Sequence, residues 1–109
     1  MSDVPQTPPT ELADDAVVLD VREQDEWDLG HAPNAVHIPL GHLAARVDEL
    51  PQIEGPLPVT CKGGGRSARA VAWLTQQGFL ATNVDGGMTA WAGAGKQMVA
   101  AGDAVPRVK

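Results

Sequence analysis

The sequence predicts an α/β domain of three layers, with a mostly parallel central β-sheet and helices on both of its faces. Short apolar runs rich in β-branched residues alternate along the chain with segments of helical spacing or composition. A glycine-rich turn joins one such run to an alanine-rich segment, as expected where a strand passes into a helix. The 109 residues suffice for a single domain, with a core expected over about residues 10–99 and loose ends at 1–9 and 100–109.

The order of the expected elements is the alternation typical of a parallel sheet. Strands are expected at residues 16–21, 35–38, 58–60 and 79–84. Helices are expected at residues 23–29, 40–50, 67–77 and 88–94. Turns rich in glycine and proline separate these elements, chiefly at residues 30–34 and 51–58.

Two of the expected helices differ in how their apolar residues are arranged. Over residues 40–50 the apolar side chains recur at the spacing of one helical face, at Leu40, Leu43, Ala44, Val47 and Leu50. Over residues 67–77 they run nearly all round, and Gly78 ends the segment. We therefore expect the second helix to be buried on most sides and to hold the loop before it rigidly.

The net charge of −6 and the pI near 4.8 argue against nucleic acid as a partner. Three of the eight basic residues nevertheless fall close together, at Lys62, Arg66 and Arg69, and would give an acidic body a local positive mouth. The N-terminus has no basic region followed by an apolar stretch, and no apolar run approaches the roughly 20 residues that span a membrane. We expect a cytoplasmic protein with no membrane partner.

The only cysteine, Cys61, opens a loop that reads CKGGGRS over residues 61–67. A free thiol has a pKa of about 8.5, and only its thiolate is a good nucleophile. The start of a helix, the inward-turned amides of Gly63, Gly64 and Gly65, and the charges of Lys62 and Arg66 should all lower that pKa. We also expect Ser67 to cap the helix, and Arg69 to add positive charge at the rim.

The composition of this loop is compatible with two other roles, a buried apolar cysteine and a nucleotide phosphate site. A lone cysteine is more often a small buried apolar residue than a nucleophile, but such a residue needs neither three glycines nor an Arg-Ser step. A basic glycine-rich turn also suits a nucleotide phosphate, but the phosphate-loop pattern is absent. With one cysteine the chain cannot form an internal disulfide, so any acceptor of a sulfur on Cys61 must be external.

The loop resembles the active-site loop of the rhodanese family, Cys-x-x-Gly-x-Arg-Ser/Thr. Two flanking stretches resemble the same family, in the same order along the chain. The first is LDVRE at residues 19–23, followed by GHAPNA at 30–35 and Ile-Pro at 38–39. The second is VDGGM at residues 84–88, running to Trp91. Together the motifs extend the resemblance over roughly residues 10–99.

The resemblance implies a sulfurtransferase in which Cys61 takes sulfane sulfur from a small anionic donor such as thiosulfate. The persulfide would pass its sulfur to cyanide or to a thiol, which could belong to a protein. Residues 62–67 would bind the substrate, and no metal or organic cofactor is implied. In the place of Lys62 many members carry arginine, which presents a planar fork that lysine lacks.

Two alternatives to a sulfurtransferase remain, one a different enzyme and the other a protein without catalytic activity. A phosphatase or arsenate reductase on the same fold is disfavoured, because only four residues separate Cys61 from Arg66 and there is no second cysteine. Similar phosphatases have one more residue in the loop. A non-catalytic interaction module is the other alternative, but members of that kind often lack the cysteine that this chain keeps.

Further residues invite supporting roles or a metal site. Asp20 and Arg22 flank a strand end, where a structural ion pair is favoured over substrate contact. Asp85 ends another strand, and its carboxylate is expected to brace the catalytic loop. The three histidines, His31, His37 and His42, do not have the spacing of a zinc site, so no metal site is expected.

Overall fold

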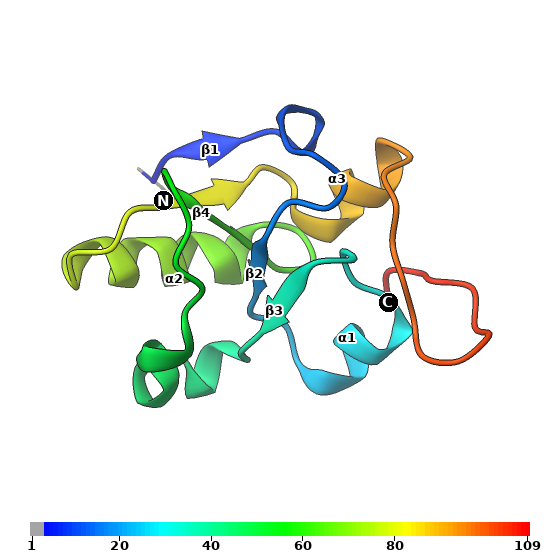
Figure 1. Cartoon of the computed structure of the whole chain (residues 1–109), viewed down its shortest axis with the longest axis horizontal. Helices are drawn as coiled ribbons and strands as arrows, with labels where there is room; N and C mark the ends of the chain where they lie inside the picture. The colour runs from blue at the N-terminus through cyan, green and yellow to red at the C-terminus, as the bar shows by residue number, and fades with distance from the viewer. Residues whose placement is uncertain (1–3) are drawn as a thin grey trace.

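A computed structural model describes residues 4–109, which form a five-stranded sheet in the order β1-β5-β4-β2-β3 (Figure 1). Every neighbouring pair of strands is parallel. The strands are β1 Gln6–Thr7, β2 Val18–Asp20, β3 Ala35–His37, β4 Leu57–Thr60 and β5 Ala81–Val84. The predicted fold class is confirmed.

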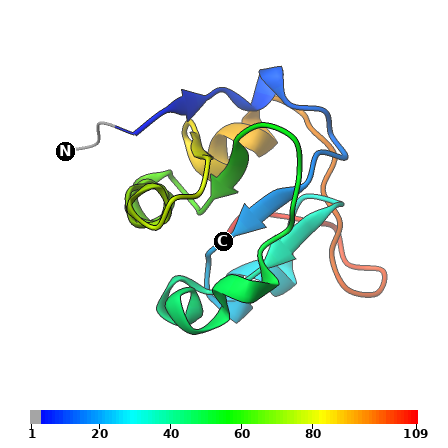
Figure 2. The same ribbon diagram turned by 60° about the vertical axis from the view of Figure 1, so that its left-hand side comes forward.

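Helices lie on both faces of the sheet. The α-helices are α1 Gln24–Leu29, α2 Gly65–Gln76 and α3 Gly87–Gly93, and the 3-10 helices are η1 Pro9–Glu11, η2 Leu40–His42 and η3 Ala44–Glu49. In Figure 2, where α2 is seen nearly end-on, α2 and the 3-10 turns η2 and η3 lie on one side of the sheet, and α3 lies on the other. No helix among residues 4–109 combines the length and the apolar character needed to cross a bilayer.

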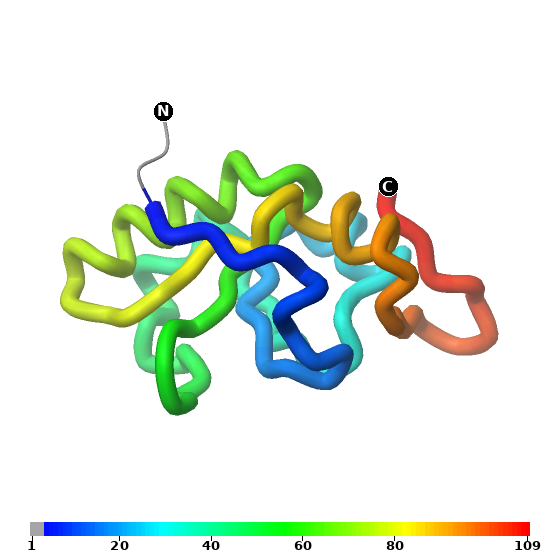
Figure 3. Tube along the Cα trace, turned by 90° about the horizontal axis from the view of Figure 1, so that it is seen from above, coloured from blue at the N-terminus to red at the C-terminus, as the bar shows by residue number. Residues whose placement is uncertain are grey.

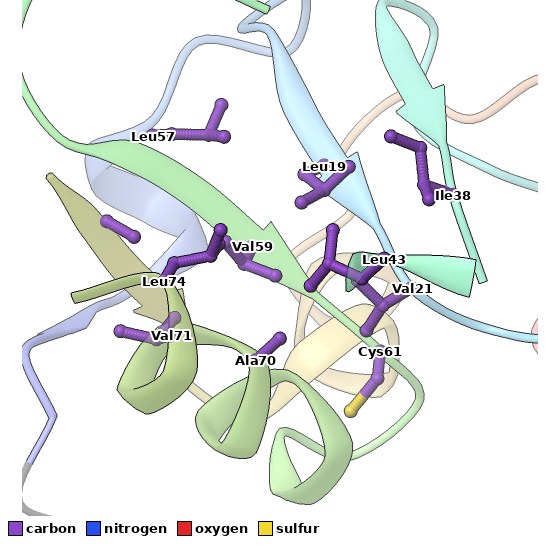
Figure 4. Close-up of a cluster of buried hydrophobic side chains, with 11 residues drawn as sticks. Leu19, Val21, Ile38, Leu43, Leu57, Val59, Cys61, Ala70, Val71 and Leu74 are labelled. Carbon is purple, nitrogen blue, oxygen red and sulfur yellow. The ribbon is translucent and has the colours of Figure 1, made fainter. Parts of the chain in front are cut away.

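Two apolar clusters fill the space between the layers. The larger lies between the sheet and α2, and Figure 4 shows Leu19, Val59 and Leu74 within it. The smaller surrounds Trp91 and Met88 of α3, both fully buried, on the opposite face. Alternation along β2 sends Val18 to the smaller cluster and Leu19 to the larger one.

The expected helix over residues 40–50 is instead two successive 3-10 helices. Arg46 interrupts the second with non-helical angles, φ −121° and ψ 22°. Gly41 lowers helix propensity here, and Pro39 and Pro51 confine the segment to a short span. The spacing of the apolar residues nevertheless predicted which side chains face the core, because Leu43 is buried and Leu40 packs against the larger cluster.

The expectation that α2 is buried on most sides is wrong. Only the face that carries Ser67, Ala70, Val71 and Leu74 is buried. Ala72 is exposed, because an alanine fits the solvent face of a helix as well as its interior. The helix therefore anchors the loop before it through one face alone.

Both ends of the described chain pack against the domain instead of lying loose. Residues 6–7 add an edge strand beside β5, as the tube view of Figure 3 shows. At the other end the amide of Arg107 donates to the carbonyl of Leu29, and Lys109 pairs with Asp25 of α1. A Cβ on Gly30 would lie 2.8 Å from backbone atoms of Arg107. The C-terminal residues can therefore pack here only because residue 30 is glycine.

The ion pair expected at the end of β2 is present and fully buried. The Arg22 guanidinium donates to both carboxylate oxygens of Asp20, at 2.7 to 3.1 Å. Its Nη2 also donates to the carbonyl of Gly30, at 2.8 Å. The pair thus ties the strand end to the turn after α1.

Asp20→Leu is expected to lower the free energy of unfolding by about 3–5 kcal/mol, because Arg22 becomes a buried cation without a counter-charge and keeps only its bond to the Gly30 carbonyl. Urea denaturation followed by tryptophan fluorescence measures the change. The double variant Asp20→Leu/Arg22→Met should recover most of the loss. A single variant within about 1 kcal/mol of the parent would contradict the prediction.

Candidate active site

Cys61 lies where β4 ends and the chain turns into α2, at the carboxyl edge of the parallel sheet. Ligand sites in such sheets lie at this edge. Figure 4 shows the sulfur directed from the strand end toward the first turns of α2. Gly64 makes the turn with a left-handed φ of 103°, which a residue with a side chain rarely adopts.

Three donors from the loop surround the sulfur of Cys61. The amide of Gly64 lies 3.1 Å from Sγ, the amide of Ser67 3.4 Å and the Ser67 hydroxyl 3.3 Å. Burial acts to raise the pKa of the Cys61 thiol, but the Ser67 hydroxyl and the amides of Ser67, Gly64 and Arg66 outweigh it and leave the pKa below its ordinary value. The loop therefore favours a thiolate although the residue is only 1% exposed.

Hydrogen bonds, not the side-chain cations, are the main cause of this lowered pKa, which corrects the expected roles of Lys62 and Arg66. The Arg66 guanidinium forms two bonds of 2.8 Å with the carboxylate of Glu26 in α1. Lys62 is exposed, and no salt-bridge partner for it lies within residues 4–109. Arg69 is also exposed, on the flank of the loop.

Glu26 is held by its own helix as well as by Arg66. It accepts a hydrogen bond from the amide of Glu23, so the two residues form a capping box at the start of α1. Hydrogen bonds from the Arg66 guanidinium lower the pKa of Glu26 to about 2, and the same pair raises the pKa of Arg66. Arg66 is thereby fixed at the rim of the loop.

Ser67 does not cap α2, contrary to expectation. The helix begins two residues earlier, at Gly65, and Gly64 occupies the N-cap position. Ser67 is the third helical residue and is fully buried. Its hydroxyl faces Cys61 Sγ and, at 2.5 Å, Oδ1 of Asn83 in β5.

The loop is braced by the segment after β5, but not by Asp85. The amides of Met88 and Thr89 donate to the carbonyls of Cys61 and Lys62, at 2.8 and 3.0 Å. Asp85 is exposed, and the part of the chain that the structure describes offers its carboxylate no hydrogen bond. The bracing side chain is Asn83, whose Nδ2 donates to the carbonyl of Gly64 at 3.1 Å.

Sequence reasoning missed Asn83, although a signal was available. It lies in a strand that is buried throughout. A polar side chain in such a strand requires hydrogen-bond partners nearby. Because β5 neighbours β4, which ends just before Cys61, those partners would be expected in the cysteine loop.

Two hollows lie at opposite ends of the sheet. One, of about 420 Å³, adjoins the loop and is lined by Gln6, Gly63, Gly64, Gly65, Ala68, Arg69, Asn83 and Asp85. The other, of about 540 Å³, lies near the start of β4 and contains none of the predicted site residues. Of these two hollows, the first is the one that adjoins the loop of Cys61.

Two of the histidines stack on one tryptophan. The rings of His31 and His37 lie parallel to Trp27, with centroids 3.5 and 4.7 Å away. Within residues 4–109 no three side chains of His, Cys, Asp or Glu are grouped so as to hold a metal ion.

Gly87→Ala is expected to disturb the loop and to slow alkylation of Cys61 by iodoacetamide at neutral pH. Gly87 has a φ of 60°, and a Cβ there would lie 2.5 Å from the carbonyl oxygens of Cys61 and Lys62. The free energy of unfolding should fall by about 1–3 kcal/mol. Gly63→Ala is the matched control, because its Cβ would meet nothing within 4 Å. Equal alkylation rates in the two variants would contradict the prediction.

The Glu26–Arg66 pair should make the free energy of unfolding depend on pH in the acid range. Because the folded pKa of about 2 is below the ordinary 4.5, the contribution is complete above pH 4.5 and is lost as pH falls toward 2. Urea denaturation should show that Glu26→Gln costs about 1–3 kcal/mol at pH 7, with Arg66 partly exposed, and little at pH 2. A difference that is the same at both pH values would count against the pair.

Comparison with known proteins gives one family. Residues 9–94 match the family model described as rhodanese-like domain. A protein named sulfurtransferase from Allochromatium vinosum is 36% identical over 92 residues, which is 82% of this chain and 85% of the relative.

Solved structures agree with the family match. A rhodanese-related protein from Thermoplasma volcanium superposes with a TM-score of 0.78 at 31% identity, over 87% of this chain and 97% of that one. A thiosulfate sulfurtransferase from Pseudomonas aeruginosa gives a TM-score of 0.77 at 26% identity, over 97% of this chain and 22% of that longer one. The names of these relatives support sulfur transfer as the general activity. With the loop, the flanking motifs and the parallel sheet, these matches place the chain in the rhodanese-like domain family.

Proposed function

We propose that this chain acts as a sulfurtransferase and carries sulfane sulfur as a persulfide on Cys61. The observation that carries the proposal is the set of hydrogen-bond donors from Gly64 and Ser67 around Sγ. Such donors favour an anion on sulfur without neutralising it with a fixed cation. The sulfurtransferase names of the relatives support the same reaction class.

In the first half of the cycle the Cys61 thiolate attacks the outer sulfur of a donor such as thiosulfate. A bond forms between Sγ and that sulfur, and the bond between the two donor sulfurs breaks. Sulfite leaves with the electron pair, and the single negative charge of the thiolate moves to the terminal sulfur of the persulfide. The loop amides, residues 62–67, are suited to both anions because they are donors with no charge of their own.

In the second half an external thiophile attacks the terminal sulfur. Cyanide leaves as thiocyanate, or a thiolate leaves as a persulfide, and Cys61 regains its electron pair as the thiolate. The acceptor must come from outside, because Cys61 is the only cysteine. A reducing compartment such as the cytoplasm suits an enzyme whose working group is a free thiol.

The remaining predicted residues either lie at the surface beside the loop or support the loop from the neighbouring strand end. Lys62 and Arg69 are exposed beside the loop and would attract an anionic donor toward it. Asp20 and Arg22 form a buried pair at the neighbouring strand end and would support the loop indirectly. Asp85 lines the hollow beside the loop and would face an acceptor.

Cys61→Ser should abolish transfer of sulfur from thiosulfate to cyanide while leaving the circular dichroism spectrum unchanged. Intact-mass measurement after thiosulfate treatment should show the gain of one sulfur atom in the parent and none in the variant. An unchanged mass in the parent, with other sulfane donors also tried, would favour the interaction module. Aryl phosphate hydrolysis that is lost in Cys61→Ser would favour the phosphatase.

A further inference from the structure

The hydrogen bonds around Cys61 continue from the loop into the sheet. The Ser67 hydroxyl lies 3.3 Å from Cys61 Sγ and 2.5 Å from Asn83 Oδ1. Ser67 is fully buried and Asn83 is 3% exposed. Bulk water therefore has little access to either side chain, and the Ser67 hydroxyl and Asn83 Oδ1 bond to each other or, for the hydroxyl, to the sulfur.

The orientation of the Asn83 amide follows from its other contacts. Its Nδ2 donates to the carbonyl of Gly64 and to Oε1 of Gln6, each at 3.1 Å. A backbone carbonyl only accepts, so the amide nitrogen must face Gly64. Oδ1 is therefore the atom that faces Ser67, and it too can only accept.

The Ser67 hydroxyl thus has one proton and two acceptors. When Cys61 is ionised, the charged sulfur is the stronger acceptor, and the hydroxyl donates to it. When Sγ is a thiol, or is bonded to a second sulfur, it is uncharged and a weak acceptor. The hydroxyl then donates to Asn83, and its own lone pair faces Sγ.

We propose that Asn83 is a positioning residue whose Oδ1 accepts a hydrogen bond from the Ser67 hydroxyl whenever Sγ is uncharged, and that the hydroxyl donates this hydrogen bond to the sulfur instead whenever Sγ is ionised. Asn83 then stabilises the protonated thiol relative to the thiolate. If the proposed function is right, it also stabilises the sulfur-loaded state, in which the charge has moved to the terminal sulfur. The hydroxyl changes partner at each half of the cycle, and no proton leaves Ser67.

The first test is the pH dependence of Cys61 alkylation by iodoacetamide in the full chain. Asn83→Leu should lower the pH midpoint of alkylation by roughly half a pH unit to one pH unit. Without Asn83 Oδ1, the sulfur is the only acceptor left for the hydrogen bond of the Ser67 hydroxyl. Ser67→Ala should raise it by a similar amount. In the double variant the change at Asn83 should have no further lowering effect.

This double-mutant cycle separates positioning from loop bracing. If Asn83 acted only by holding Gly64, its loss would loosen the amide donors and raise the midpoint, with or without Ser67. A midpoint that rises, or that falls equally in the Ser67→Ala background, would overturn the proposal. Gln6→Leu is the matched control, since it removes one bond to Asn83 Nδ2 and leaves Oδ1 facing Ser67; its midpoint should stay at that of the parent.

A second measurement needs no change at Asn83 and so cannot fail through misfolding. In the unaltered protein the side-chain carbonyl ¹³C resonance of Asn83 should shift with the same midpoint as the thiol, as the hydroxyl leaves Oδ1. Ser67→Ala should remove most of that shift. A resonance that ignores the thiol titration would overturn the proposal. Neither measurement uses a sulfur donor, so their outcome is independent of whether thiosulfate loads Cys61.

Discussion

The sulfur of Cys61 is held by donors that come from one turn of backbone, and the surrounding fold keeps that turn in shape. The turn contributes the amides of Gly64 and Ser67. Its own carbonyls are bonded in turn, by the amides of Met88 and Thr89 and by the side chain of Asn83. Because Gly63 and Gly64 precede α2 and lie in no helix or strand, these outside bonds help to decide where the amide of Gly64 points.

Two neighbouring strands bring the supports of the turn together. β4 delivers Cys61, and β5 delivers Asn83 and then the glycine pair that leads into α3. Gly87 approaches the carbonyls of the turn so closely that no Cβ would fit. The VDGGM motif is therefore explained by contact with the cysteine loop, and not by a turn requirement alone.

Local sequence predicts what depends on local geometry. The alternation of elements, the strand-to-helix turn and the position of Cys61 within it could all be derived from residues adjacent in the chain. The partners of Arg66 and Ser67 could not, because Glu26 and Asn83 are 40 and 16 residues away. The edge strand at residues 6–7 is too short to give a periodic signal, and it forms only because β5 offers unpaired backbone groups.

Charge placement shows the same dependence on distant contacts. Arg66 is close to Cys61 in the sequence, but its guanidinium is bonded to Glu26 and not to the sulfur. The carboxylate of Glu26 instead draws Arg66 to the rim, where the ion pair links α1 to α2. The sulfur is left among donors without net charge, and this suits a group that must hold an anion, pass its charge to a second sulfur and recover it. A cation bound directly to Sγ would stabilise the thiolate most of all, and so would oppose the attack in which that charge leaves Sγ.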